Sequence, residues 1–183
     1  MASPKDRALD AYLAAGAAAG DAVLTRRLIQ RWTPRLSALA WRLLGQAEAV
    51  DDVVQDAWIE IFKALPRLRA AEAFPAFAFR ITQRRCSRAI KSVKAERRLG
   101  EAVDAEPAPG VPDPDRGVDA QTAARTMAEL PPDQHAALWL HYIEGLSVRE
   151  IALALDVPAG TVKTRLMHGR RKLAALLEGG DHV

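Results

Sequence analysis

Cationic side chains gather in one short stretch near the end of this chain of 183 residues. Between Gly160 and Leu177 there is no acidic residue but there are five basic ones: Lys163, Arg165, Arg170, Arg171 and Lys172. Cations of this kind neutralise nucleic-acid phosphates, and hydroxyl groups beside them can reach base edges. A basic helix end that complements its own dipole would account for the last three cations, but not for Lys163 and Arg165. The pattern therefore favours a DNA-binding segment.

The residues around these cations predict a helix-turn-helix. Ser147 followed by Glu150 is the pattern of a capping box. Asp156 occupies the turn, where glycine is commoner, but Asp tolerates positive φ better than most residues. Four apolar residues of the second helix share one side: Val162, Leu166, Leu173 and Leu176. With that side inward and about 100° per residue, the outward side chains are Lys163, Thr164, Met167, His168 and Arg171, with Arg170 at the margin. A helix-turn-helix presents this second helix to the major groove.

Charge elsewhere is divided between an acidic and a basic segment, although the formal net charge is only +3. Residues 46–60 hold five acids and no base. A predicted helix over 49–65 turns Asp52, Gln55 and Asp56 outward, with Asp51 at the edge. Residues 84–98 carry a net charge of +6. The helix expected from about Phe74 through Arg98 aligns four cations in one row: Arg80, Arg84, Arg88 and Lys91. Such a row is an electrostatic track for a nucleic-acid backbone. Phe79 is expected to project from the apolar face, where it could stack on an unpaired base.

Every periodic segment is helical, so the predicted fold class is all-α, with two small helical domains joined by a flexible linker. The linker over 99–120 has four prolines, three glycines and six carboxylates against one arginine, a composition that cannot build a core. It separates a helical domain over 1–98 from a helix-turn-helix domain over 121–183. The first domain is expected to contain helices over 21–44, 49–65 and 74–98, and Pro34 should bend or divide the first of them. In the second domain, helices over 121–130 and from Pro132 precede the helix-turn-helix.

The composition argues against catalysis. Asp51, Asp52 and Asp56 are carboxylates of the kind that Mg²⁺ prefers, but no second cluster closes a site around them. The four histidines share no ligand spacing, and there is no glycine-rich phosphate loop. We therefore expect no enzyme activity, no cofactor and no metal.

The single cysteine, Cys86, excludes an internal disulfide and suits a reducing cytosol. A redox-sensitive thiol beside several arginines is the alternative. No stretch reaches the length of a membrane span. Residues 11–20 faintly resemble the apolar part of a secretory signal, but Asp6 and Asp10 flank them. We expect a cytoplasmic protein that is a monomer when free.

The order of these segments resembles the bacterial RNA polymerase sigma factors, most of all the extracytoplasmic-function (ECF) group. The resemblance is carried by the acidic VDDVVQDAWIEIFKAL, the aromatic and basic FPAFAFRITQRRCSRAIKS, the proline-acid linker and EGLSVREIALALDVPAGTVKTRL. It implies a protein that binds core RNA polymerase and directs promoter recognition, DNA melting and transcription initiation. A stand-alone helix-turn-helix regulator, binding duplex DNA without polymerase, is the alternative.

The resemblance also implies roles for particular residues. Polymerase would be bound by Asp51, Asp52, Gln55 and Asp56. The minus-ten promoter element would be contacted by Phe77, Phe79, Arg80, Gln83, Arg84, Arg88 and Lys91. The minus-thirty-five element would be contacted by Thr161, Lys163, Thr164, Met167, His168, Arg170 and Arg171. An anti-sigma factor is implied as a further partner.

Overall fold

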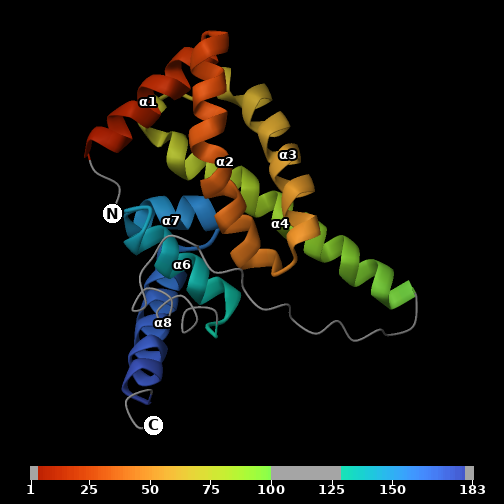
Figure 1. The fold of residues 1–183 in the computed structure, drawn as a ribbon. Coiled ribbons are helices and arrows are strands. Elements are labelled where there is room, and N and C mark those ends of the chain that lie inside the picture. The colour runs from red at the N-terminus through yellow and green to blue at the C-terminus, as the bar shows by residue number, and fades with distance from the viewer. Residues whose placement is uncertain (1–3, 100–128, 180–183) are drawn as a thin grey trace.

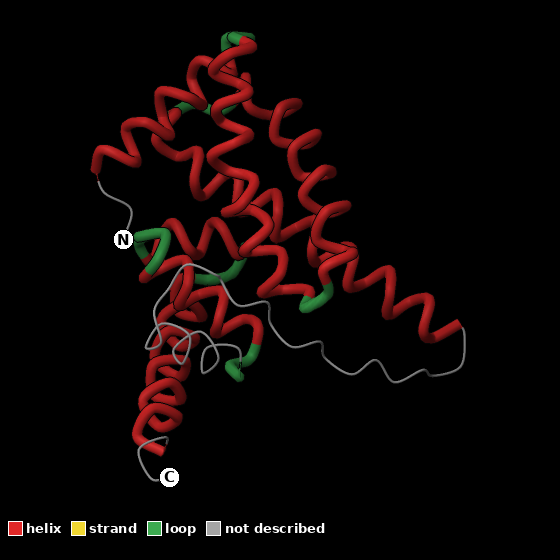
Figure 2. The backbone as a smooth tube through the Cα atoms, in the orientation of Figure 1, coloured by secondary structure: helices red, strands yellow, loops and turns green. Residues whose placement is uncertain are grey.

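The computed structural model describes residues 4–99 and 129–179, and every regular element in these two ranges is a helix (Figures 1 and 2). The first range holds α1 (Pro4–Ala18), α2 (Ala22–Leu44), α3 (Ala47–Ala64), the short 3-10 turns η1 (Leu65–Arg67) and η2 (Ala71–Ala73), and α4 (Phe74–Leu99). The second holds α6 (Pro132–Tyr142), α7 (Val148–Leu155) and α8 (Ala159–Gly179). The predicted all-α fold is confirmed. The expected linker and the expected helix over 121–130 lie almost wholly outside the described residues.

α2 is one long helix with a defined start and end. The Asp21 side chain caps it by accepting the N–H groups of Val23 and Leu24 at 2.8 and 2.9 Å. Gly45 ends it with φ 68°, a left-handed conformation that glycine adopts without strain. The helix continues through Pro34, which is exposed. Pro34 therefore does not divide the helix.

α1 is a helix that the sequence analysis did not predict. It contains most of residues 11–20, which were compared with a secretory signal. It is rich in alanine, and its sequence shows no pronounced apolar stripe. Its key buried group is a carboxylate: Asp10 is 1% exposed and accepts the indole N–H of Trp32 at 3.0 Å. This hydrogen bond fixes α1 against α2. Among the described residues, no helix is both long enough and apolar enough to span a bilayer.

α3 and α4 pack with α2 around a shared apolar core. Val50, Val54 and Ile61 of α3 are buried. On α4 the side chains of Phe74, Ala78 and Ile81 belong to the same core. Trp32 of α2 meets Phe74 edge to face, with ring centroids 4.9 Å apart. α4 then extends past the other helices, as Figure 1 shows. Three residues in its last part, Lys91, Ser92 and Val93, are exposed.

The helix-turn-helix has the predicted construction. The Glu150 N–H donates to Ser147 Oγ at 3.3 Å, and the Ser147 N–H donates to Glu150 Oε2 at 2.8 Å. Asp156 takes φ 54° between α7 and α8, as its place in the turn predicted. α8 approaches α6 closely at Gly169, where an added Cβ would lie 2.9 Å from Leu138 Cδ1. A larger residue at that position would require the Leu138 side chain to move.

The two halves of the chain pack directly against each other. α7 lies across α4, and α6 lies against α2 (Figure 1). Phe79 of α4 meets Trp139 of α6 at 5.6 Å between ring centroids, and the Arg42 guanidinium of α2 lies 4.7 Å from the Trp139 ring centroid. We call this contact of α1, α2 and α4 with α6 and α7 the interdomain seam. The sequence predicted the two domains but not the seam.

We predict that protonation of His135, on α6, destabilises the folded chain. Burial, and secondarily the positive charge of Arg42, lowers the pKa of His135 from 6.5 to about 4. Because the folded pKa lies below the unfolded one, the neutral ring stabilises the fold fully above pH 6.5, and this contribution is lost as the pH falls toward 4. At about 1.4 kcal/mol per pKa unit, the loss approaches roughly 3 kcal/mol.

Chemical denaturation of the wild type and of a His135→Gln variant across this pH range measures the effect. The free energy of unfolding of the variant should lack this part of the pH dependence. If the free energy of unfolding depended on pH in the same way in the two proteins, the prediction would be contradicted.

Candidate partner-binding and nucleic-acid interfaces

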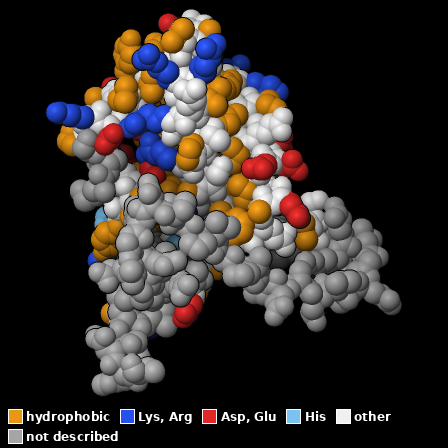
Figure 3. All heavy atoms as spheres, viewed as in Figure 1, with side chains coloured by type: hydrophobic (Ala, Val, Ile, Leu, Met, Phe, Trp, Pro, Cys, Tyr) orange, Lys and Arg blue, Asp and Glu red, His pale blue; other side chains and the backbone are white. Residues whose placement is uncertain are grey.

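α3 presents the four polar residues expected to bind polymerase. All are exposed on the side of the helix away from the core: Asp51, Asp52, Gln55 and Asp56. Figure 3 shows acidic side chains gathered on this part of the surface. Arg85 of α4, which the sequence analysis did not single out, partly neutralises the face: it donates to Asp56 at 3.0 Å and to Glu60 at 2.7 Å. Arg85 therefore neutralises the end of the face near Asp56 and Glu60 more than the end at Asp51 and Asp52.

An apolar hollow of about 420 Å³ between α2 and α3 adjoins this acidic face. Trp58 lines it, with its indole N–H donating to Thr33 Oγ1 at 3.0 Å and its ring stacked on Phe62 at 5.2 Å. Ile59, at 47% exposed, and Asp51 also line the hollow. Carboxylate and apolar surfaces are thus continuous. Such a surface suits a partner helix that carries both cations and apolar side chains.

The basic row predicted on α4 is exposed along its length: Arg80, Arg84, Arg88 and Lys91. Gln83 lies beside the row and donates to Ser87 Oγ at 3.1 Å. Phe77 is half-buried, with its ring centroid 6.3 Å from that of Phe74. The four cations lie on α4, the helix whose end extends past its neighbours (Figure 1). They form a row of positive charge that an extended polyanion can follow.

Phe79 does not project from the surface as expected; this prediction was wrong for the conformation seen here. Its side chain is fully buried, with ring centroids 5.3 Å from Trp32 and 5.6 Å from Trp139. The reason lies in the tertiary structure, because Trp32 of α2 and Trp139 of α6 both pack against the Phe79 ring. Helical periodicity within one segment cannot reveal side chains that come from other helices.

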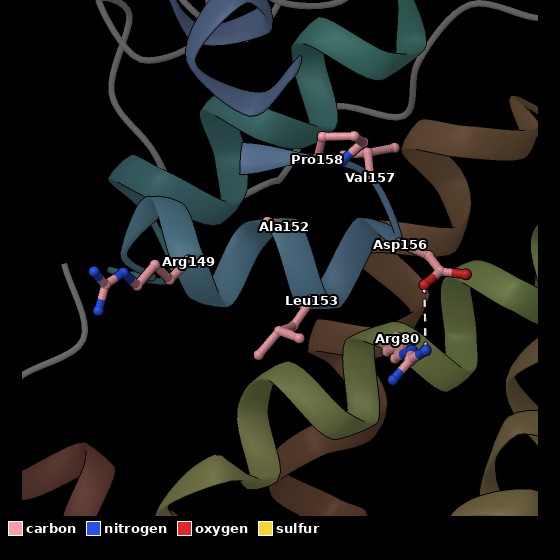
Figure 4. A pocket seen from close by; sticks show the side chains of 7 residues that line it. All are labelled: Arg80, Arg149, Ala152, Leu153, Asp156, Val157 and Pro158. Carbon is pink, nitrogen blue, oxygen red and sulfur yellow. Dashed lines mark hydrogen bonds and ion pairs between the residues drawn. The ribbon is translucent and has the colours of Figure 1, made fainter. Parts of the chain in front are cut away.

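Arg80 belongs both to the basic row and to the interdomain seam. Its Nη2 donates to Asp156 Oδ1 at 3.2 Å, in the turn of the helix-turn-helix (Figure 4). The two residues line a hollow of about 540 Å³ between α4 and α7, together with Arg149 and the 57% exposed Leu153. One end of the basic row is thus in contact with the second domain.

α8 turns its polar side outward as predicted. Val162 and Leu166 are buried, and five of the expected DNA-contacting residues are exposed: Lys163, Thr164, Met167, Arg170 and Arg171. Thr161 and His168 are half-buried. Arg165 instead is half-buried and donates to Asp133 of α6 at 2.6 Å.

Hydrogen bonds within the second domain occupy some of the donor groups on the polar side of α8. The Thr164 hydroxyl donates to the Gly160 carbonyl at 3.1 Å, so its methyl group and oxygen lone pairs remain for a ligand. Arg170 Nε donates to the Leu166 carbonyl at 3.1 Å. Lys172 donates to the Glu129 carbonyl at 3.1 Å, so it joins α8 to the segment just before α6.

The carboxylates considered as metal ligands do not converge on a site. Within residues 4–99 and 129–179, no three histidine, cysteine, aspartate or glutamate side chains are placed to hold one ion. Asp56 faces Arg85 rather than another carboxylate. The carboxylates of α3 form a charged, exposed face.

The fold and these surfaces define a transcription-initiation factor of the sigma-70 type. Residues 28–96 match the family model of Sigma-70 region 2, and residues 121–173 match that of Sigma-70, region 4. The ECF RNA polymerase sigma factor SigM of Mycobacterium tuberculosis is 31% identical over 172 residues, which cover 92% of this chain and 84% of that protein. The chain belongs to the ECF RNA polymerase sigma factors.

Two further comparisons agree. The ECF RNA polymerase sigma factor SigE of Mycolicibacterium smegmatis is 30% identical over 154 residues, which cover 80% of this chain and 58% of SigE. The sigma factor RpoE of Bartonella quintana, solved in complex with the anti-sigma factor NepR, has a similar fold, with a TM-score of 0.72. At 22% identity, the match covers 84% of this chain and 96% of RpoE.

Membership of this family sets the general function. The chain is a sigma factor that directs RNA polymerase to promoters and to transcription initiation, and the family is not enzymatic. The resemblance drawn from the sequence is confirmed. α1 lies outside both matched segments.

We predict that Cys86 is an unreactive thiol. It is 1% exposed, and burial raises its pKa to about 12, so the reactive thiolate is scarce at neutral pH. Labelling by a disulfide reagent should be at least about 100-fold slower in the folded chain than in denaturant. Promoter-directed transcription by a Cys86→Ser variant should respond to oxidant as the wild type does. Rapid labelling, or a response that disappears in the variant, would restore the redox-sensor alternative.

Proposed function

We propose that the acidic face of α3 binds a basic helical element of core RNA polymerase. The observation that carries this proposal is the exposed pair Asp51 and Asp52 beside the hollow lined by Trp58 and Ile59. A charged rim next to an apolar hollow provides both attraction over distance and apolar burial on contact. Gln55 adds a neutral hydrogen-bonding group between the carboxylates and the hollow. In this proposal residues 1–98 form the polymerase-binding and minus-ten domain.

The basic row of α4 would hold the opened minus-ten element. Arg84, Arg88 and Lys91 are exposed at helical spacing and can follow a strand of phosphates. The segment 66–74, with exposed Arg67 and Arg69, would contact the same strand where α4 begins. Phe77, Phe79 and Gln83 would supply contacts to bases, and Phe79 would have to be uncovered first.

α8 would enter the major groove at the minus-thirty-five element, so that residues 121–183 form the second DNA-binding domain. Lys163, Thr164 and Met167 are exposed on one side near its start, and Arg170 and Arg171 continue that side toward the phosphate backbone. Thr161 and His168 lie at its margins. Hydroxyl and apolar groups flanked by cations suit base reading combined with backbone anchoring. The segment 99–120 would act as the tether between the two domains.

An anti-sigma partner and a cytoplasmic location complete the proposal. The partner is supported by family membership and by the similar fold of a sigma factor solved with an anti-sigma factor bound. The location is supported by the action of sigma factors on RNA polymerase and by the unpaired Cys86. We infer a monomer when the chain is free of polymerase. A stand-alone regulator would not require a region 2 domain, which favours the polymerase-dependent function.

Charge reversal on α3 is the sharpest test of polymerase binding. Asp52→Arg should weaken the affinity for core polymerase by about 30-fold or more, because it replaces attraction by repulsion at the contact. The exposure of Asp52 means that the circular dichroism spectrum and the melting temperature should change little. Glu129→Arg, with the same change of charge on the second domain, should leave affinity near the wild-type value. Equal affinities for the wild type and Asp52→Arg would refute the proposed face.

A lysine substitution tests DNA contact by α8. Lys163→Ala should weaken promoter binding by the polymerase complex, and should reduce the slope of log affinity against log salt concentration by about one. Lys5→Ala removes an exposed lysine of α1 and should leave that slope unchanged. An unchanged slope for Lys163→Ala would mean that Lys163 does not meet a phosphate.

A further inference from the structure

A largely buried arginine joins the two domains. The Arg35 guanidinium lies 3.7 Å from the ring centroid of the buried Trp32, and its side chain is 18% exposed. Its Nη1 donates to Asp10 of α1 at 2.9 Å, and its Nε donates to Glu144, just after α6, at 2.7 Å. Both carboxylates are nearly inaccessible, Asp10 at 1% and Glu144 at 6%. The seam thus contains one cation shared by carboxylates from the two domains.

α1 adds a second connection of the same kind. Arg7 donates to Glu150 Oε1 at 3.0 Å and to the Gly145 carbonyl at 2.6 Å. Glu150 is also the carboxylate of the capping box that starts α7. α1 is fixed to the first domain through Asp10, whose Oδ1 accepts Arg31 Nε at 2.7 Å. It therefore acts as a strap that runs from the first domain to the start of the helix-turn-helix.

The docked arrangement is incompatible with simultaneous contact to both promoter elements. It buries Phe79 and engages Arg80 with Asp156. Each domain measures roughly 30 Å across, so the docked pair spans about 60 Å. Promoter elements about 25 base pairs apart are separated by roughly 85 Å. The two domains must therefore separate before each can lie on its own element.

We propose that α1 and Arg35 form an ionic latch that keeps the helix-turn-helix domain docked on α4, and that the latch opens when the chain joins polymerase. Its effect on initiation rests on the proposed function; the latch itself does not. Buried ion pairs contribute little net free energy, because desolvation offsets most of their attraction. A seam held by such pairs can stay closed in the free chain and still open when polymerase binds the two domains.

The latch has a measurable consequence for binding. If the open form alone binds polymerase productively, the apparent dissociation constant rises in inverse proportion to the open fraction. A variant that weakens the latch should therefore bind core polymerase more tightly than the wild type. A gain in binding affinity is an unusual result of removing a native contact.

Energy transfer between two dyes on the full-length chain tests the latch without polymerase. Lys63→Cys on α3 and Ala174→Cys on α8 provide exposed attachment points, while the native Cys86 is buried. The latch variant combines Arg7→Ala with Glu144→Gln. The control combines Arg26→Ala with Glu129→Gln, which removes the same charges from exposed positions, one in each domain. Measurements at about 50 mM salt keep the ion pairs poorly screened.

We expect the transfer efficiency to fall in the latch variant and to stay at the wild-type value in the control. The affinity for core polymerase should rise by up to about tenfold in the latch variant only. Arg7→Ala alone should give a smaller fall in transfer, and because this side chain is 41% exposed, the variant should fold normally. Circular dichroism checks the helical content of each protein.

The outcomes separate the two proposals. Unchanged transfer in a folded latch variant refutes the latch, whatever polymerase does. Reduced transfer without a gain in affinity refutes the role of the latch in initiation. Reduced transfer together with no binding of any variant to core polymerase supports the latch and refutes the proposed function.

Discussion

The burial of one arginine constrains how this molecule is assembled. A guanidinium that is largely removed from water requires carboxylate partners, and Arg35 takes them from two separate elements. Asp10 comes from α1 at the start of the chain, and Glu144 from the turn before the helix-turn-helix. The three groups satisfy one another only when α1, α2 and that turn are together. The position of α7 on α4 follows, because α7 begins a few residues after Glu144.

This constraint divides the functional surfaces into two kinds. The acidic face of α3 and the outer side of α8 remain exposed in the docked chain. The start of the basic row is not freely exposed, because the Phe79 ring packs against Trp139 and Arg80 donates a hydrogen bond to Asp156. The surfaces proposed for first contact with polymerase and duplex DNA are thus available at once. Part of the surface proposed for the opened strand becomes available only after the domains separate.

Local patterns account for most of the helices and for part of the sites. The capping box at Ser147, the positive φ of Asp156 and the buried side of α8 all depend on residues within a few positions of one another. α1 was missed because its alanine-rich sequence shows no stripe, and because it is held by polar contacts of Asp10 and Arg7 with distant residues. The pairing of Arg85 with Asp56, 29 positions away, was missed for the same reason.

Helical periodicity and charge spacing therefore determined the fold class, the helix-turn-helix and the outward-facing acids and cations. These properties follow from hydrogen bonds and side-chain spacing within each helix. Only the assembled molecule shows that Phe79 is buried, that α1 is attached to both domains and that Arg35 is shared between Asp10 and Glu144. Each depends on which helix covers which face, and that choice is made by packing and by the pairing of buried charges between residues far apart in the chain.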